Sequence, residues 1–293
     1  MKRLAQSNKT VGILIFLTIC LTLSCEKETT EPLCCVEEET TGGTNGENSG
    51  ENTGETGGTT GGDTGGTTGG EGETNVGDDV PEIYSKIYAA SDIYLEGDYV
   101  VIEVNGVPDH NSPYFVTSSS QYEAYNGDNP DFRQNPNNIE SFDFKYRIPL
   151  NPAEATNHSA TQLGSIGVAL NGVPLFNQYA GPNNQPLTNE INSFDQHAGH
   201  PQPQGIYHYH VEPSYLTTTK GKEALLGFLL DGFPVYGPEE EGVTITNDDL
   251  DTYHGHSHVN EDYPDGIYHY HVTSNDPYIN GSGYYGTPGT VTQ

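Results

Sequence analysis

Hydrophobic residues from about residue 81 onward recur at alternate positions, and turn-forming residues separate the apolar segments. This period of two predicts β-strands, and no helix-period stretch exceeds two turns except around residues 81–90. Two hairpins are predicted where apolar runs flank Asn171-Gly172 and Asp231-Gly232, and the run 99–104 before Asn105-Gly106 suggests a third. Proline after each turn predicts that the returning strand lies at a sheet edge or beside a bulge. The pattern therefore predicts an all-β, β-sandwich-like domain.

The first 80 residues have a different pattern. Lys2, Arg3 and Lys9 precede an apolar run from 11 to 23, which is typical of a secretory signal peptide and is short for a membrane span. The segment 21–25 resembles a bacterial lipobox, so we expect a lipoprotein signal peptide at 1–24, acylation of Cys25 and a location at the bacterial outer membrane or cell surface. Residues 25–80 are rich in Gly, Thr and Glu and predict a disordered tether before a domain at 81–293.

The charge and cysteine content exclude several classes of partner and site. Asp and Glu number 41 against 10 Lys and Arg, giving a net charge of −31. A phosphate backbone requires clustered basic residues, so we expect no nucleic-acid partner. All four Cys lie within the first 35 residues, which leaves the predicted domain without a disulfide or a Cys-based zinc site. Cations held by His and carboxylate are the more plausible ligands.

A duplication spans about residues 163–216 and 224–279. Each unit has its hairpin turn, then a His-rich loop, then the string Gly-Ile-Tyr-His-Tyr-His-Val, which begins at Gly205 and at Gly266. Asn171 and Gly205 are 34 positions apart, and Asp231 and Gly266 are 35 apart. A repeat this long is unlikely to arise by chance, so it predicts a domain built from two related halves.

The histidines of the repeat form the candidate site. In a strand, His208 and His210 point to one face while the tyrosines point to the other, and the same holds for His269 and His271. We expect pseudo-symmetry to bring the two pairs to a single ion, with loop histidines completing the site. Imidazole suits copper or zinc better than Ca²⁺ or Mg²⁺. The alternative is that each His is a buried hydrogen-bonding residue of the sheet. The candidate ligands are His200, His208, His210, His269, His271, His256 and His258, with Asp195 and Asp251 as acceptors that orient the imidazoles.

Several motifs together resemble the YHYH domain family over roughly residues 99–286. They are Asn105-Gly-Val-Pro-Asp-His110, Arg147-Ile-Pro-Leu-Asn-Pro152, Asp195 with Gly199-His200, the two Tyr-His-Tyr-His strings and the segment 230–238. The resemblance adds His110 to the candidate ligands. Many members of that family have Cys at the position of His197, and this departure favours His200 as the ligand.

Three functional classes remain open on the sequence. One is a surface protein that binds copper or zinc through its His-x-His strands. The second is an extracellular enzyme, such as a hydrolase, lyase or oxidase, whose His-bound metal keeps an open position. The third is a non-catalytic adhesion or interaction module. The sequence identifies neither the metal nor a protein or polysaccharide partner, and it does not decide whether the protein is an enzyme.

Overall fold

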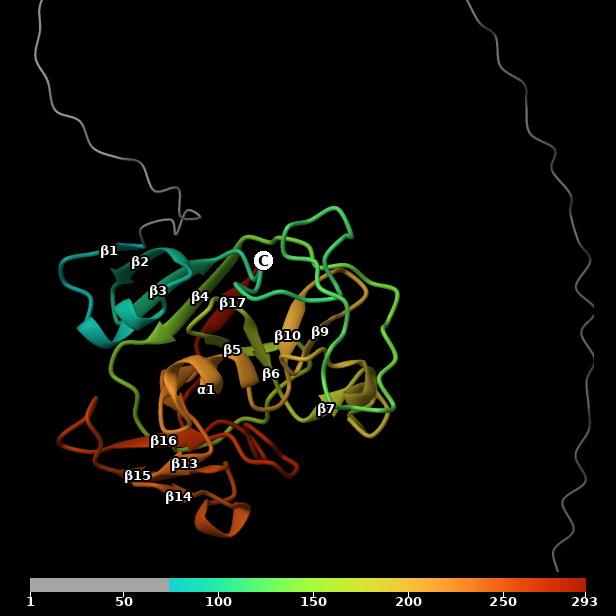
Figure 1. Cartoon of the computed structure of the whole chain (residues 1–293). Helices are drawn as coiled ribbons and strands as arrows, with labels where there is room; N and C mark the ends of the chain where they lie inside the picture. The colour runs from blue at the N-terminus through green and yellow to red at the C-terminus, as the bar shows by residue number, and fades with distance from the viewer. Residues whose placement is uncertain (1–73) are drawn as a thin grey trace, which may run out of the picture. The chain divides into compact units, whose positions relative to one another are not determined.

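The computed structural model describes residues 74–293, which form a mainly β domain (Figure 1). The predicted signal peptide, Cys25 and the tether up to residue 73 lie outside the described residues. The all-β prediction is confirmed, since the described residues contain several sheets and one α-helix. Within residues 74–293 no helix is long and apolar enough to cross a bilayer.

Four strands that precede the duplicated region and one that follows it form a five-stranded sheet. Its order is β1 (Asn75–Val76), β2 (Ala90–Glu96), β3 (Tyr99–Val104), β4 (Phe144–Pro149) and β17 (Thr290–Thr292). β1 pairs in parallel with β2, and the other pairs are antiparallel. β1 precedes Pro81, so strand structure begins before the domain boundary expected from the sequence.

The larger sheet contains eight strands, all from the duplicated region. Its order is β15 (Gly255–His258), β16 (Ile267–His271), β12 (Pro234–Tyr236), β11 (Leu225–Leu229), β5 (Ser165–Ala169), β6 (Pro174–Phe176), β10 (Tyr207–Tyr209) and β9 (Gly199–Pro201). Both predicted hairpins are confirmed, because β5 pairs with β6 across Asn171-Gly172 and β11 pairs with β12 across Asp231-Gly232.

The two halves of this sheet meet at its centre, where β5 and β11 run antiparallel. Gly167 pairs with Leu229, and Gly227 pairs with Ala169, so equivalent residues exchange places across the pair. A Cβ at Gly167 would lie 2.4 Å from the carbonyl oxygen of Phe228, and a Cβ at Gly227 would lie 2.2 Å from that of Val168. Both halves therefore need glycine at the position where they join.

Short elements connect the sheet strands. β7 (Tyr179–Ala180) pairs with β8 (Gln185–Pro186), and β13 (Glu239–Glu240) pairs with β14 (Val243–Thr244). The helical segments are η1 (Glu82–Lys86), η2 (Glu190–Ser193), η3 (Asn247–Asp249) and α1 (Ser214–Lys220). η1 falls within the region 81–90 where the sequence suggests helical periodicity.

Two details of the predicted hairpins differ from expectation. The prediction of a third hairpin at Asn105-Gly106 is wrong, because a loop and not a returning strand follows β3. β3 pairs instead with β2 and β4. Pro174 and Pro234 lie in interior strands and not at an edge. The bulge alternative is correct, since the register of β5 shifts between Ser165 and Gly167 and that of β11 shifts between Leu225 and Gly227.

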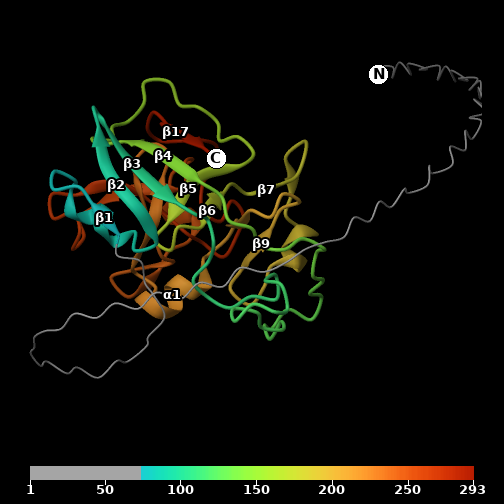
Figure 2. The ribbon, with the colours of Figure 1, turned by 90° about the horizontal axis from the view of Figure 1, so that it is seen from above.

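The five-stranded sheet packs against the central strands of the larger sheet, as Figures 1 and 2 show. One buried apolar cluster contains residues of both sheets, including Ile102 and Ile148 from the smaller sheet and Ile166 and Phe228 from the larger. At the contact the Tyr146 hydroxyl lies 2.8 Å from the hydroxyl of Ser165. This packing buries the centre of the larger sheet and leaves its two outer ends for other contacts.

Candidate metal centres

Strand periodicity separates the tyrosines from the histidines of each repeated string. In β10 the Tyr207 and Tyr209 rings lie on one face, where the Tyr207 hydroxyl donates to Asp195 and the Tyr209 hydroxyl accepts from Asn171. His208 lies on the opposite face, and His210 follows directly after the strand. All four side chains are buried. The tyrosine face is thus locked into the core, which holds the histidine face in a fixed orientation.

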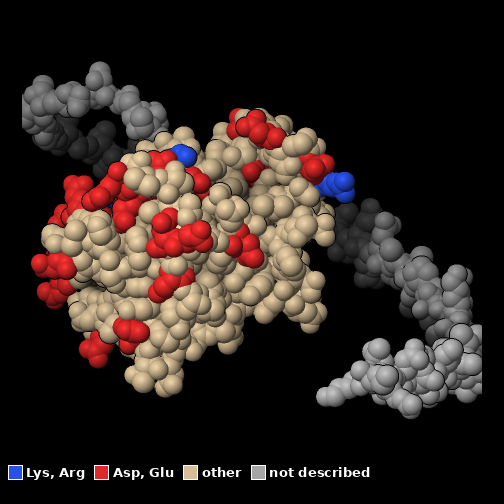
Figure 3. All heavy atoms as spheres, turned by 90° about the horizontal axis from the view of Figure 1, so that it is seen from below, with Lys and Arg blue, Asp and Glu red and all other residues tan. Residues whose placement is uncertain are grey.

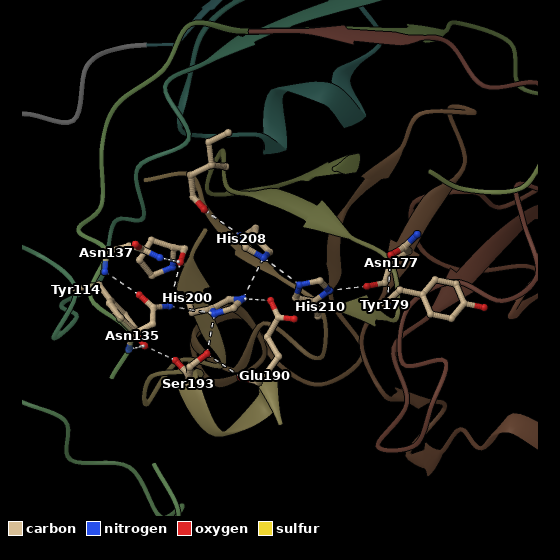
Figure 4. Close-up of polar contacts among 12 residues, drawn as sticks. Tyr114, Asn135, Asn137, Asn177, Tyr179, Glu190, Ser193, His200, His208 and His210 are labelled. Carbon is tan, nitrogen blue, oxygen red and sulfur yellow. Dashed lines mark hydrogen bonds and ion pairs between the residues drawn. The ribbon is translucent and has the colours of Figure 1, made fainter. Parts of the chain in front are cut away.

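Centre 1 consists of His200, His208, His210 and Glu190, whose ligand atoms all lie within 4.8 Å of one another (Figure 4). His200 comes from the edge strand β9, directly opposite His208 of β10 in the antiparallel ladder. The Nε2 atoms of His200 and His208 are 3.1 Å apart, and those of His208 and His210 are 2.9 Å apart. Glu190 of η2 places Oε1 3.2 Å from Nε2 of His200. Three imidazoles and one carboxylate therefore face one point.

The opposite ring nitrogen of each imidazole in centre 1 has an acceptor that fixes its proton. Nδ1 of His208 lies 2.9 Å from the carbonyl oxygen of Ile206, and Nδ1 of His210 lies 2.5 Å from that of Asn177. A carbonyl oxygen only accepts, so both Nδ1 atoms are protonated. Nδ1 of His200 lies 2.8 Å from the Ser193 hydroxyl, which donates its own hydrogen to the carbonyl of Glu190.

The tautomers of His208 and His210 leave their Nε2 lone pairs pointing toward each other across 2.9 Å. Burial, followed by the repulsion that His200 and His210 would exert if protonated, holds the pKa of His208 well below 6.5, and burial lowers the pKa of His210 to about 4. Neither ring is protonated at neutral pH, so no proton is available to bridge the two Nε2 atoms. Burial acts to raise the pKa of Glu190, but contacts with His200 and His210 lower it below its ordinary value. A cation at this point would convert mutual repulsion into shared coordination.

Centre 2 repeats the arrangement with His256, His269, His271 and Glu240. His256 of β15 lies opposite His269 of β16, with 3.2 Å between their Nε2 atoms. Nδ1 of His269 donates to the carbonyl of Ile267, and Nδ1 of His271 donates to that of Gly237, at 3.0 and 2.7 Å. Nε2 of His271 is buried without a hydrogen-bond partner among the described residues. Burial lowers the pKa of His269, and it lowers that of His271 to about 4.

Glu240 faces all the imidazoles of centre 2. Its Oε1 atom lies 3.3 Å from Nε2 of His269 and 3.8 Å from Nε2 of His271, and its Oε2 atom lies 3.4 Å from Nε2 of His256. His258 stands at the rim, with Nδ1 3.1 Å from Glu240 Oε1. Burial acts to raise the pKa of Glu240, but the surrounding histidines lower it.

The two carboxylates were not anticipated from the sequence, because they come from non-equivalent positions in the repeat. Glu240 lies in β13, and the matching residue of the first unit, in β7, is Ala180. Glu190 instead comes from η2, in the loop before His200. Comparing the two units therefore reveals no shared acid. The signals available were the triplet Glu239-Glu240-Glu241 after the second hairpin and a lone Glu ten residues before His200. The same ligand set is thus assembled in two different ways.

The structure does not bring the two strand pairs to one ion. β10 and β16 lie on either side of the central β5–β11 pair, as the labels in Figure 1 show for β10, β5 and β16. Five strand intervals separate them, which is roughly 24 Å across the sheet. The expectation of one shared ion is therefore wrong: the halves join through their first hairpins, which places the histidine strands far apart.

The remaining candidates lie outside the two centres. His110 is buried on the tyrosine face, where Nε2 lies 2.9 Å from the Tyr209 hydroxyl and the ring packs 4.2 Å from that of His197. Asp195 accepts from the hydroxyls of Tyr207 and Ser112, and Asp251 accepts from that of Tyr268. Neither aspartate bonds to an imidazole of a centre, so both position the tyrosine face. Main-chain carbonyls and Ser193 take the orienting role instead.

The geometry of both centres fits a transition metal. Zinc is bound by imidazole at 2.0–2.1 Å in a tetrahedral arrangement, which places ligand atoms about 3.3 Å apart. The separations between adjacent donor atoms, 2.9–3.2 Å in centre 1 and 3.2–3.8 Å in centre 2, lie close to this value. Residues 74–293 contain no Cys or Met, so the sulfur ligands that select Cu(I) are absent from the described chain. Three imidazoles and a carboxylate suit zinc or Cu(II).

Comparison with known proteins supports the resemblance found in the sequence. A sequence model for the family described as YHYH protein matches residues 145–242 and 239–283, in two segments. Together the segments contain every residue of both centres. No curated protein and no solved structure matches the chain.

Proposed function

Residues 145–283 belong to the YHYH protein family, and we propose that in this chain they bind two transition-metal ions, one in each centre. The ions are zinc or copper, and Cu(II) rather than Cu(I) because every ligand is nitrogen or oxygen. The observation behind the proposal is the orientation of the imidazoles: Nδ1 of His208, His210, His269 and His271 is bound to a carbonyl, which directs each Nε2 lone pair inward. A network built only for stability would place a donor between these atoms.

Metal content tests this proposal. The full chain is purified without added metal, incubated with excess zinc or copper, dialysed and measured by elemental analysis. We expect two ions per wild-type chain, one in His208→Gln, one in His269→Gln and none in the double variant. His254→Gln is the matched control, since His254 is buried, bonds to Thr273 and lies outside both centres. It should retain two ions. Wild-type protein without bound metal would refute the proposal.

We further propose that the chain acts at a cell surface, held there by an acyl group on Cys25. The support is the lipobox-like segment and the Gly-rich stretch that follows it. Metal capture, buffering or delivery is the role that fits such an anchored chain best.

A metal-dependent enzyme is the second candidate, and one observation favours it. A cavity of about 450 Å³ opens directly onto centre 1 and is lined in part by all three of its histidines. Catalytic zinc sites keep one position for water or substrate. Glu190, whose side chain is 27% exposed, is the most accessible residue of centre 1.

A further inference from the structure

The cavity at centre 1 adjoins a second one of about 490 Å³. The two have four lining residues in common, Leu163, Gly164, Phe176 and Gln202, so they adjoin, and together they are termed the groove. Each is within the size range of sites for organic ligands. A groove of this extent suits an elongated ligand better than a single small molecule.

The lining of this groove is unlike the rest of the protein. Among the described residues that line it, Glu190 is the one acidic or basic side chain apart from the histidines of centre 1. The chain as a whole has a net charge of −31, and the face in Figure 3 shows many Asp and Glu and few Lys or Arg. The cavity beside centre 2 is lined by five glutamates, among them Glu223 and Glu261. A groove with a single acidic side chain, in a chain otherwise so acidic, points to an uncharged ligand.

The groove offers both apolar surface and free amide groups. Leu163 is 47% exposed at the boundary of the two cavities. Pro182 and Pro203 are exposed on the side of centre 1, and Tyr179 is half-buried there. The side-chain amides of Gln162 and Gln202 have no hydrogen-bond partner within residues 74–293. Apolar and aromatic faces that pack on C–H groups, beside amides that bind hydroxyls, match the chemistry of a sugar chain.

A peptide fits this groove less well. An extended peptide usually binds by adding a strand to an open sheet edge. The edge strand here is β9, where Pro201 has no N–H to donate and its carbonyl already accepts from the amides of Asn135 and Asn137. At Pro201, therefore, no main-chain N–H is present and the carbonyl that a peptide would use is already bonded.

We propose that this groove binds a neutral carbohydrate chain and presents it to the metal of centre 1. The inference rests on the proposed function, because the bound ion supplies the contact at the inner end of the groove. The cavity beside centre 2 is lined by glutamates instead, which favours cations over sugars. The two centres thus differ in what they admit besides metal.

Calorimetric titration of the metal-loaded full chain tests the inference, with cello-, laminari-, xylo-, manno- and maltohexaose as probes. We expect at least one to bind with a Kd of about 1 mM or tighter. Leu163→Asp places a charge in the groove and should weaken that binding at least about tenfold. The control is Val243→Asp, since Val243 is 63% exposed in β14 and does not line the groove; it should change the Kd less than about twofold.

Metal analysis of the same samples separates the two proposals. Leu163→Asp should retain two ions per chain, because Leu163 is not a ligand in either centre. Two bound ions with no hexasaccharide binding would overturn the groove inference and leave the proposed function standing. Binding unaffected by Leu163→Asp, or a neutral proline-rich peptide that competes for the groove, would also overturn it. A chain that takes up no metal overturns the proposed function, and the inference with it.

Discussion

Replacing Glu240 by Gln should have opposite effects on the metal-free and the metal-loaded protein. At pH 8 without metal, the Glu240 carboxylate faces Nε2 lone pairs of neutral imidazoles, 3.3 Å away at His269 and 3.8 Å away at His271. The amide of Gln can donate to one of these nitrogens. A neutral hydrogen bond contributes about 0.5–1.5 kcal/mol, so the metal-free variant should be about 1 kcal/mol more stable than wild type.

With metal, the same variant loses an anionic ligand. If the Kd of centre 2 rises about 100-fold, then at a metal concentration of 1,000 times the wild-type Kd the stabilisation from this centre falls from about 4.1 to about 1.4 kcal/mol. For a domain of this size, such a loss lowers the Tm by roughly 5–11 °C. Thermal unfolding in EDTA and in excess zinc measures both effects.

Glu239→Gln is the control for this experiment. Glu239 is the neighbour of Glu240 in β13, and its Oε1 atom lies 3.9 Å from Nζ of Lys222 rather than against the imidazoles. Exposed ion pairs contribute little, so this variant should match wild type within about 0.5 kcal/mol in both conditions. If Glu240→Gln destabilised the metal-free protein, or left the zinc-dependent gain in Tm unchanged, the carboxylate would have a structural role and the reasoning would fail.

Three further predictions concern pH and location. Burial raises the pKa of Asp231 to about 6, so its contribution to stability is present below about pH 4 and is lost as the pH rises through 6. In urea unfolding with EDTA, the free energy of unfolding of Asp231→Asn, which copies Asn171 of the first unit, should rise relative to wild type by up to about 3 kcal/mol between pH 4 and pH 7. A difference between the two proteins that does not change with pH would contradict this. Burial lowers the pKa values of His210 and His271 to about 4, so their contribution to stability is present above pH 6.5 and is lost as the pH falls toward 4. In a chelator titration monitored by elemental analysis, metal should therefore remain bound at pH 6.5 and be released as the pH approaches 4. Metal retained at pH 4 would show that other residues are the ligands. Cys25→Ala should release the chain from membranes into the medium in a fractionation experiment, and wild type already in the soluble fraction would refute the anchor.

The sequence predicted the local architecture where local chemistry determines it. Asn171-Gly172 and Asp231-Gly232 formed the predicted hairpins, because an Asx-Gly pair between apolar runs supplies the positive φ that such a turn needs: φ is 74° at Gly172 and 86° at Gly232. Asn105-Gly106 has the same signal and no hairpin. Gly106 also has positive φ, but a Cβ there would lie 2.7 Å from the Phe144 ring, so this turn serves close packing against β4.

The grouping of the histidines could be predicted only in part. Alternation correctly placed His269 and His271 on one face of β16, and His208 of β10 on the same side as His210 directly after it, because side-chain direction is a local property. Strand order is not local: it depends on Gly167 and Gly227, which let β5 and β11 approach, and it separates the pairs into two centres. Glu190 and Glu240 were missed because they lie in η2 and β13, short elements outside the main sheets whose placement the periodicity of the sequence does not predict.

Anomalous diffraction at the metal absorption edge, from crystals of the chain grown with zinc, tests the central claim most directly. The account predicts two peaks roughly 24 Å apart. One should lie at about 2.0–2.1 Å from Nε2 of His200, His208 and His210, and the other at the same distance from Nε2 of His256, His269 and His271. Peaks on other residues, or full zinc occupancy elsewhere with none between these imidazoles, would contradict it and leave the histidines as hydrogen-bonding residues of the sheet.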